Sequence, residues 1–114
     1  MDTPDRLVVI WSSGDREVAL YSCLMYAHNS KKKSWWDEVR LVVWGPSAPL
    51  LVRDAELQDK IRTMKQDGVE LMACKSCSDA YGVSEQLEAL GVEVLYVGDL
   101  LTEMLQTGWT SLTY

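Results

Sequence analysis

The segment Arg6-Leu7-Val8-Val9-Ile10-Trp11 contains an unbroken apolar run, and the turn-forming residues Ser12-Ser13-Gly14-Asp15 follow it directly. An apolar run of this kind is typical of a strand that is buried on both faces of its sheet. Residues 16–29, rich in Leu, Ala, Met and Tyr, then predict a helix that begins at this turn. A buried strand followed by a helix is the repeating unit of a parallel sheet.

The same alternation continues along the chain and predicts an α/β fold. Further strands are predicted at residues 39–44, 69–73, 92–97 and 109–114, and further helices at 50–66, 76–81, 83–90 and 100–106. Strands separated by helices pair in parallel through right-handed crossovers, so that helices cover both faces of the sheet. We therefore expect a five-stranded parallel sheet in a single domain over residues 1–114, because this length suits one domain and no linker interrupts the pattern.

Composition and charge narrow the classes of protein. The hydrophobic fraction of 47% is too high for a disordered chain. The net charge of −6 disfavours a nucleic-acid partner, because an acidic surface repels phosphate backbones. The basic run Lys31-Lys32-Lys33 is expected to be a solvated helix end rather than a phosphate or membrane patch.

The sequence also favours a cytoplasmic protein without a membrane partner. No apolar run approaches the roughly 20 residues that cross a bilayer. Residues 1–6 are polar, unlike the basic start of a signal peptide. The number of cysteines is three, and an odd number without an export signal argues against a framework of structural disulfides.

Loops at the carboxyl ends of the predicted strands are the expected place for a site. Ligands and catalytic groups of parallel α/β sheets gather at this edge. The loops are residues 12–15, 45–49, 74–78 and 98–99.

The strongest chemical signal in these loops is Cys74-Lys75-Ser76-Cys77. Cys74 is expected at the end of the third strand, and Cys77 in the first turn of the helix that follows. Backbone N–H groups at a helix start and the charge of Lys75 favour a thiolate, which is the nucleophile in sulfur chemistry. The alternative is that both cysteines are small buried apolar residues.

Other cysteine chemistries are disfavoured by position, and neither a metal nor a cofactor is expected. Zinc requires four ligands, and the remaining candidates, Cys23 and His28, lie five residues apart on a helix and so do not share a face. A thioredoxin-like pair would follow an early strand, whereas this pair follows the third. His28 is expected to be a partly exposed residue near a helix end, and a papain-like hydrolase would need a histidine beside Cys74.

Two further loops are candidate binding segments. The first comprises Ser12, Ser13, Gly14 and Asp15, and the second comprises Gly45, Pro46 and Ser47. The first could cradle a phosphate, but Asp15 would repel it, so a helix cap is the preferred interpretation. The second is a rigid turn that is expected to line the site beside Cys74, together with Lys75 and Ser76.

Six segments, taken together, match the pattern of a known family. They are Trp11-Ser12-Ser13-Gly14-Asp15-Arg16-Glu17-Val18-Ala19, Trp44-Gly45-Pro46-Ser47-Ala48, Ala73-Cys74-Lys75-Ser76-Cys77-Ser78-Asp79-Ala80-Tyr81-Gly82-Val83, Gly91-Val92-Glu93-Val94, Leu101-Thr102 and Gly108-Trp109. Nearly the whole chain thus resembles the DsrE-like family of small α/β proteins. The resemblance implies a three-layer α/β/α fold and assembly into homo-oligomers, often trimers or hexamers, and the five tryptophans also favour self-association.

The resemblance also implies a function. Well-understood relatives carry sulfur as a persulfide on a cysteine after a central strand, in sulfur oxidation, sulfite reduction or tRNA thiolation. Cys74 matches that position, and Cys77 departs from the single-cysteine pattern. The leading hypothesis is a sulfurtransferase-like carrier in which Cys74 accepts sulfur from a donor protein and Cys77 resolves the persulfide or forms a transient disulfide. Alternatives are a non-enzymatic oligomeric binding or scaffold module, and a nucleotide or flavin binder that uses residues 12–15.

Overall fold

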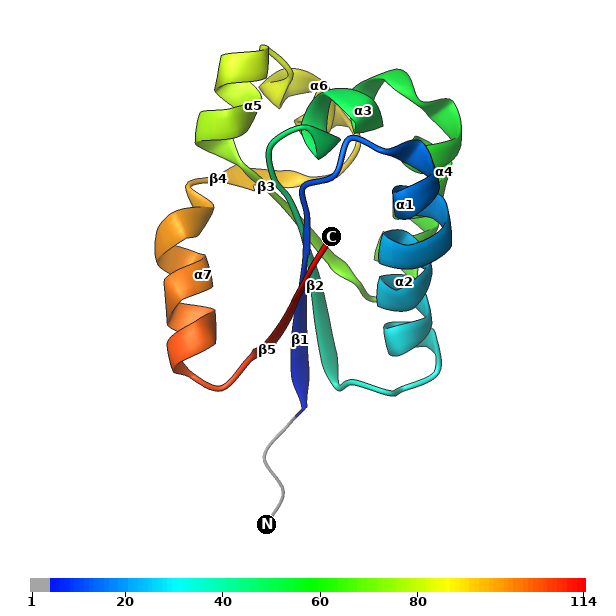
Figure 1. Ribbon diagram of the computed structural model, residues 1–114, viewed down its shortest axis with the longest axis vertical. Helices are drawn as coiled ribbons and strands as arrows, with labels where there is room; N and C mark the ends of the chain where they lie inside the picture. Colours follow the sequence, from blue (N-terminus) through cyan, green and yellow to red (C-terminus); the bar gives the residue numbers. More distant parts are fainter. Residues whose placement is uncertain (1–4) are drawn as a thin grey trace.

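Five parallel strands form the centre of the protein, in the order β4-β3-β2-β1-β5 (Figure 1). The computed structural model describes residues 5–114, so the first four residues of the polar segment 1–6 lie outside the described residues. The strands are β1 (Arg6–Trp11), β2 (Glu38–Val43), β3 (Glu70–Cys74), β4 (Glu93–Leu95) and β5 (Thr110–Thr113). The predicted α/β fold with a five-stranded parallel sheet is confirmed.

Helices connect successive strands and cover both faces of the sheet. They are α1 (Arg16–Val18), the π-helical turn η1 (Ala19–Cys23), α2 (Leu24–Lys32), α3 (Ser47–Arg53), α4 (Ala55–Gln66), α5 (Lys75–Tyr81), α6 (Ser84–Ala89) and α7 (Val97–Gln106). Figure 1 shows α7 alone on one side of the sheet and α1, α2 and α4 on the other, with α3, α5 and α6 near the carboxyl ends of the strands. The three-layer arrangement is therefore confirmed.

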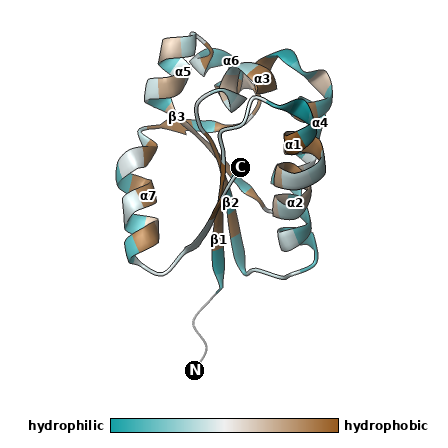
Figure 2. Ribbon diagram, viewed as in Figure 1, coloured by the Kyte–Doolittle hydropathy of each residue, from teal (hydrophilic) through white to brown (hydrophobic). Residues whose placement is uncertain are grey.

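The sheet separates two apolar layers. Alternate side chains of a strand point to opposite faces, so Leu7 and Val9 pack toward α1–α4, whereas Val8 packs toward α7. Hydrophobic segments accordingly lie in the middle of the sheet, whereas the lower ends of β1 and β2 are hydrophilic (Figure 2). On α4, Leu57, Ile61 and Met64 are fully buried, as their helical spacing predicts.

The predicted helix over residues 50–66 is in fact two helices, because Asp54 interrupts it. Its backbone is extended, and its carboxylate accepts a hydrogen bond from the N–H of Leu57 at 3.1 Å, which caps α4. Arg16 pairs with Asp54 at 2.6 Å and also with Glu56. The Leu57 N–H and Arg16 both lower the pKa of the Asp54 carboxyl. This cluster joins the start of α1 to the start of α4.

The bounds of α7 and β4 also differ from those predicted. The helix predicted at residues 100–106 begins at Val97, because Val97, Leu101 and Met104 form the helical stripe that packs on the sheet. The strand expected at residues 92–97 is correspondingly confined to β4. Residues 98–99, expected to be a loop, therefore lie in the first turn of α7.

The run Lys31-Lys32-Lys33 lies at a helix end, as predicted. The run ends α2, where Lys31 donates to the Asp37 carbonyl at 2.8 Å and Lys32 and Lys33 are exposed, as expected for a solvated helix end.

Within residues 5–114, no helix combines the length and apolarity that crossing a membrane requires.

Candidate functional site

Cys74 and Cys77 lie at the junction between β3 and α5. Cys74 is the last residue of β3, and its extended backbone leads directly into the first turn of α5. Cys77 lies in that first turn. Residues three apart at a helix start are neighbours, so the two thiols lie close together, and Cys74 raises the pKa of Cys77. The predicted positions of both cysteines are therefore confirmed.

The two thiols differ in solvent access. Cys74 is only 8% exposed, whereas Cys77 is half-buried. Alternate residues of β3 face α7, so Cys74 points to the same side as Met72 and packs in the apolar layer with Val97 and Leu101. The expectation of an open thiol at the edge of the sheet thus applies to Cys77 better than to Cys74.

Cys77 is surrounded by groups with opposing effects on its thiol. Burial raises the pKa of Cys77, and a hydrogen bond and charge interaction with Cys74 raise it further. The backbone N–H of Gly45 and the side chain of Trp44 lower this pKa, because both stabilise the thiolate. The loop after β2 therefore borders the thiol pair, and Gly45 adopts a left-handed conformation there (φ 68°).

Lys75, predicted to stabilise a thiolate, is paired elsewhere. Its Nζ donates to Asp79 Oδ2 at 3.0 Å and lies 6.0 Å from the centre of the Tyr96 ring. Asp79 raises the pKa of Lys75, which keeps the ammonium charged but shares its charge with a carboxylate. Ser76 is exposed on the first turn of α5.

The loop at residues 12–15 serves as a helix cap and contacts Tyr114, the residue after β5. Asp15 accepts hydrogen bonds from the N–H groups of Glu17 at 2.8 Å and Val18 at 3.2 Å, which confirms the cap interpretation. Ser12 donates its N–H and its hydroxyl to the Tyr114 carbonyl at 2.8 and 2.9 Å. These groups hold the loop in place and are occupied within the protein. The Ser13 hydroxyl likewise accepts from the N–H of Asp15.

Ser47 braces the neighbouring loop from inside the protein. Its hydroxyl donates to the Trp11 carbonyl at 2.5 Å and accepts from the Trp44 N–H at 3.2 Å, and the residue is fully buried. Ser47 therefore ties the carboxyl ends of β1 and β2 together and supports the Cys77 neighbours without facing solvent. Pro46 is exposed and lies against Gly14, so the two candidate loops adjoin.

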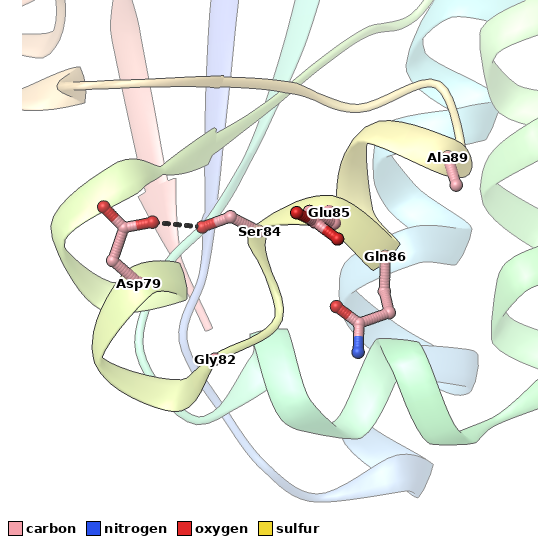
Figure 3. A pocket seen from close by; sticks show the side chains of 6 residues that line it. All are labelled: Asp79, Gly82, Ser84, Glu85, Gln86 and Ala89. Atoms are coloured by element: carbon pink, nitrogen blue, oxygen red, sulfur yellow. Dashed lines mark hydrogen bonds between the residues drawn. The ribbon is translucent and has the colours of Figure 1, made fainter.

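A chain of hydroxyl groups next to the cysteines was not anticipated from the sequence. The hydroxyls of Ser78 and Ser84 lie 2.6 Å apart, and Ser84 donates to Asp79 Oδ1 at 2.5 Å. Figure 3 shows the Asp79–Ser84 bond at the edge of a hollow of about 640 Å³. Neither cysteine lines this hollow. The network clamps α5 to α6 across the turn at Gly82, and it therefore fixes the helix that carries Cys77.

With this geometry established, comparison with known proteins identifies the family. A sequence model described as the DsrE/DsrF-like family matches residues 6–114. The chain belongs to the DsrE/DsrF-like family. No curated protein matches it.

Three solved structures share the fold of this DsrE/DsrF-like chain. BT1422 from Bacteroides thetaiotaomicron, a conserved protein of unknown function, is 34% identical with a TM-score of 0.92, over 96% of this chain and 95% of that one. YchN from E. coli is 17% identical with a TM-score of 0.78, over 96% and 99%. MTH1491 from Methanobacterium thermoautotrophicum, also of unknown function, is 23% identical with a TM-score of 0.73, over 96% and 100%.

The remaining cysteine and the histidine of the DsrE/DsrF-like chain lie away from the thiol pair. Cys23 is fully buried, and burial raises its pKa to about 12. His28, expected to be partly exposed, is instead buried, because its Nε2 bonds to Asp67 Oδ2 at 2.6 Å across the packed helices. Within residues 5–114, no group of three His, Cys, Asp or Glu side chains is arranged to hold a metal ion.

Proposed function

We propose that this DsrE/DsrF-like protein handles sulfane sulfur on the Cys74–Cys77 pair. The observation that carries the proposal is the placement of two free cysteines side by side at the carboxyl end of a central strand, one of them partly open to solvent. Parallel α/β proteins concentrate their chemistry at this edge. Family membership supports the same role, since the DsrE/DsrF-like description suggests sulfur relay.

The chemistry requires a thiolate and a donor persulfide. The thiolate attacks the outer sulfur of the donor, the sulfur–sulfur bond of the donor breaks, and the donor leaves as a thiol. The Gly45 N–H and the Trp44 side chain, which favour the thiolate of Cys77, would also stabilise the persulfide anion that forms. The partners are a sulfur-donating and a sulfur-accepting molecule or protein, and the compartment is the cytoplasm, where thiols stay reduced.

Mass spectrometry tests this function directly. Reduced protein is incubated with glutathione persulfide, and we expect the peptide that contains Cys74 and Cys77 to react, seen either as the added mass of one sulfur atom or as a Cys74–Cys77 disulfide with release of sulfide. The control is the double variant Cys74→Ala/Cys77→Ser, which retains Cys23 and should remain unmodified. A wild-type protein that also remains unmodified would contradict the proposal.

The second candidate is an oligomeric binding or scaffold module, and we propose assembly into a trimer or hexamer in either case. All four residues of the edge strand β5 are exposed, Leu112 among them. Tyr96, which follows the opposite edge strand β4, and Leu105 on α7 are exposed as well. Exposed apolar side chains beside an unpaired strand edge favour association. Sedimentation equilibrium should give three or six times the chain mass of 12.9 kDa, and a mass of 12.9 kDa would contradict assembly. If the cysteine variants retain assembly, partner binding and cellular phenotype, the scaffold function replaces the sulfur function.

A further inference from the structure

The access of the two thiols decides which of them can meet a donor. Cys74 is enclosed on the α7 side by Met72, Val97 and Leu101, and only 8% of its surface is exposed. Cys77 adjoins the Gly45 loop and is only half-buried, so part of its side chain is open to solvent. A thiolate must reach the donor sulfur in order to attack it, so accessibility favours Cys77 as the first nucleophile.

We infer that Cys77, rather than Cys74, receives the sulfur, and that Cys74 then displaces it as hydrogen sulfide by closing a Cys74–Cys77 disulfide. The inference rests on the proposed function and adds a reaction to it, the reduction of a persulfide to sulfide. It reverses the order that the resemblance implies, in which Cys74 accepts the sulfur.

Both steps balance. In the first, the Cys77 thiol and a donor R–S–SH give Cys77–S–SH and R–SH. In the second, the Cys74 thiol attacks the inner sulfur of Cys77–S–SH, so that the disulfide forms and the outer sulfur leaves with both protons as H₂S. The two cysteines are oxidised and the sulfane sulfur is reduced. An external dithiol, itself oxidised to a disulfide, then returns the pair to the reduced state.

The positions of the groups favour attack on the inner sulfur. Cys74 interacts with Cys77 itself, and the space behind Cys74 is filled by apolar side chains. An added sulfur on Cys77 therefore has room toward solvent rather than toward Cys74. The three-residue spacing at the start of α5 keeps the two sulfurs adjacent for disulfide closure.

Single-turnover reactions of three proteins with glutathione persulfide test the order. The mass of the wild-type protein should fall by that of two hydrogen atoms through disulfide formation, and one equivalent of sulfide per chain should be released. Cys74→Ala should retain one sulfur on Cys77 and release no sulfide. Cys77→Ser should gain sulfur on Cys74 at least about tenfold more slowly than Cys74→Ala gains it on Cys77, because Cys74 is buried. Circular dichroism verifies that each variant is folded, and Cys74→Ser serves as a second variant if Cys74→Ala is not.

The outcomes separate this inference from the proposed function. If Cys77→Ser gains sulfur as fast as Cys74→Ala does, Cys74 is an equally good acceptor, and the inference is wrong while the sulfur function stands. If Cys74→Ala still releases sulfide in full yield, the disulfide step is wrong. If neither cysteine of the wild-type protein is modified, both proposals fail.

Discussion

Removal of the buried thiol Cys23 should change how the stability of the protein depends on alkaline pH. Burial raises the pKa of Cys23 from 9.0 to about 12. Below the lower value the thiol is protonated in both the folded and the unfolded chain, so its contribution is complete and independent of pH. Between the two values the unfolded chain loses the proton while the folded protein keeps it, and stability therefore falls as the pH rises.

The size of the effect follows from the shift. Each pH unit above about 9 should lower the free energy of unfolding by about 1.4 kcal/mol, which approaches about 4 kcal/mol near pH 12. Tyr114, whose pKa is raised by burial and then by Cys23, adds a slope of the same sign. The comparison is therefore made between Tyr114→Phe and the double variant Tyr114→Phe/Cys23→Ala.

Urea denaturation between about pH 8 and about pH 11 measures this slope. Cys23→Ala lowers stability by a constant amount through lost packing, but its curve should be flatter above about pH 9. Parallel curves for the two proteins would refute the reasoning. A protonated, enclosed Cys23 also explains why the only thiols available for sulfur chemistry in the described residues are Cys74 and Cys77.

Three further predictions concern packing and the thiol pair. Trp109→Ala should lower the free energy of unfolding by about 3–5 kcal/mol in urea denaturation, because this buried ring also contacts two guanidinium groups. Arg40→Met removes one of these groups and should lower it by only about 0.5–1 kcal/mol. Equal losses for the two variants would contradict this prediction. Ser47→Ala should cost about 0.5–1.5 kcal/mol by the same assay, because the Trp11 carbonyl loses one of its two donors and keeps the Trp44 N–H at 2.9 Å. An unchanged midpoint would show that the Ser47 hydrogen bond does not stabilise the protein. Alkylation of Cys77 by iodoacetamide should have a pH midpoint above that of a free thiol, because burial and Cys74 raise the pKa of Cys77. Cys74→Ala should move this midpoint down. A midpoint that stays in place would show that Cys74 does not raise the pKa of Cys77.

Local patterns sufficed to predict the sheet and the position of the thiol pair. The apolar runs of β1 and β3 and the stripe on α4 depend on side chains within one element, so they can be recognised without knowledge of the packing. The strand-to-helix junction at Cys74 follows from the same patterns. The capping role of Asp15 is equally local, because its partners lie two and three residues away.

The details that decide chemistry depend on contacts between distant segments. The burial of Cys74 depends on α7, which follows it by more than 20 residues. The pairing of His28 with Asp67 and the donation from Ser47 to Trp11 join separate elements, so sequence spacing carries no signal of them. The Ser78–Ser84 contact requires the turn between α5 and α6 to fold back on itself.

The coverage of one sheet face by α7 alone has a consequence for the timing of the chemistry. Helix α7 has ten residues and is anchored mainly by Val97, Leu101 and Met104. A single helix with so narrow an apolar contact can detach by local opening without unfolding of the sheet. Hydrogen exchange of the α7 amides and chemical modification of Cys74 should then depend on the same local opening of α7. The rate of this opening would limit how fast Cys74 reacts with any reagent other than Cys77.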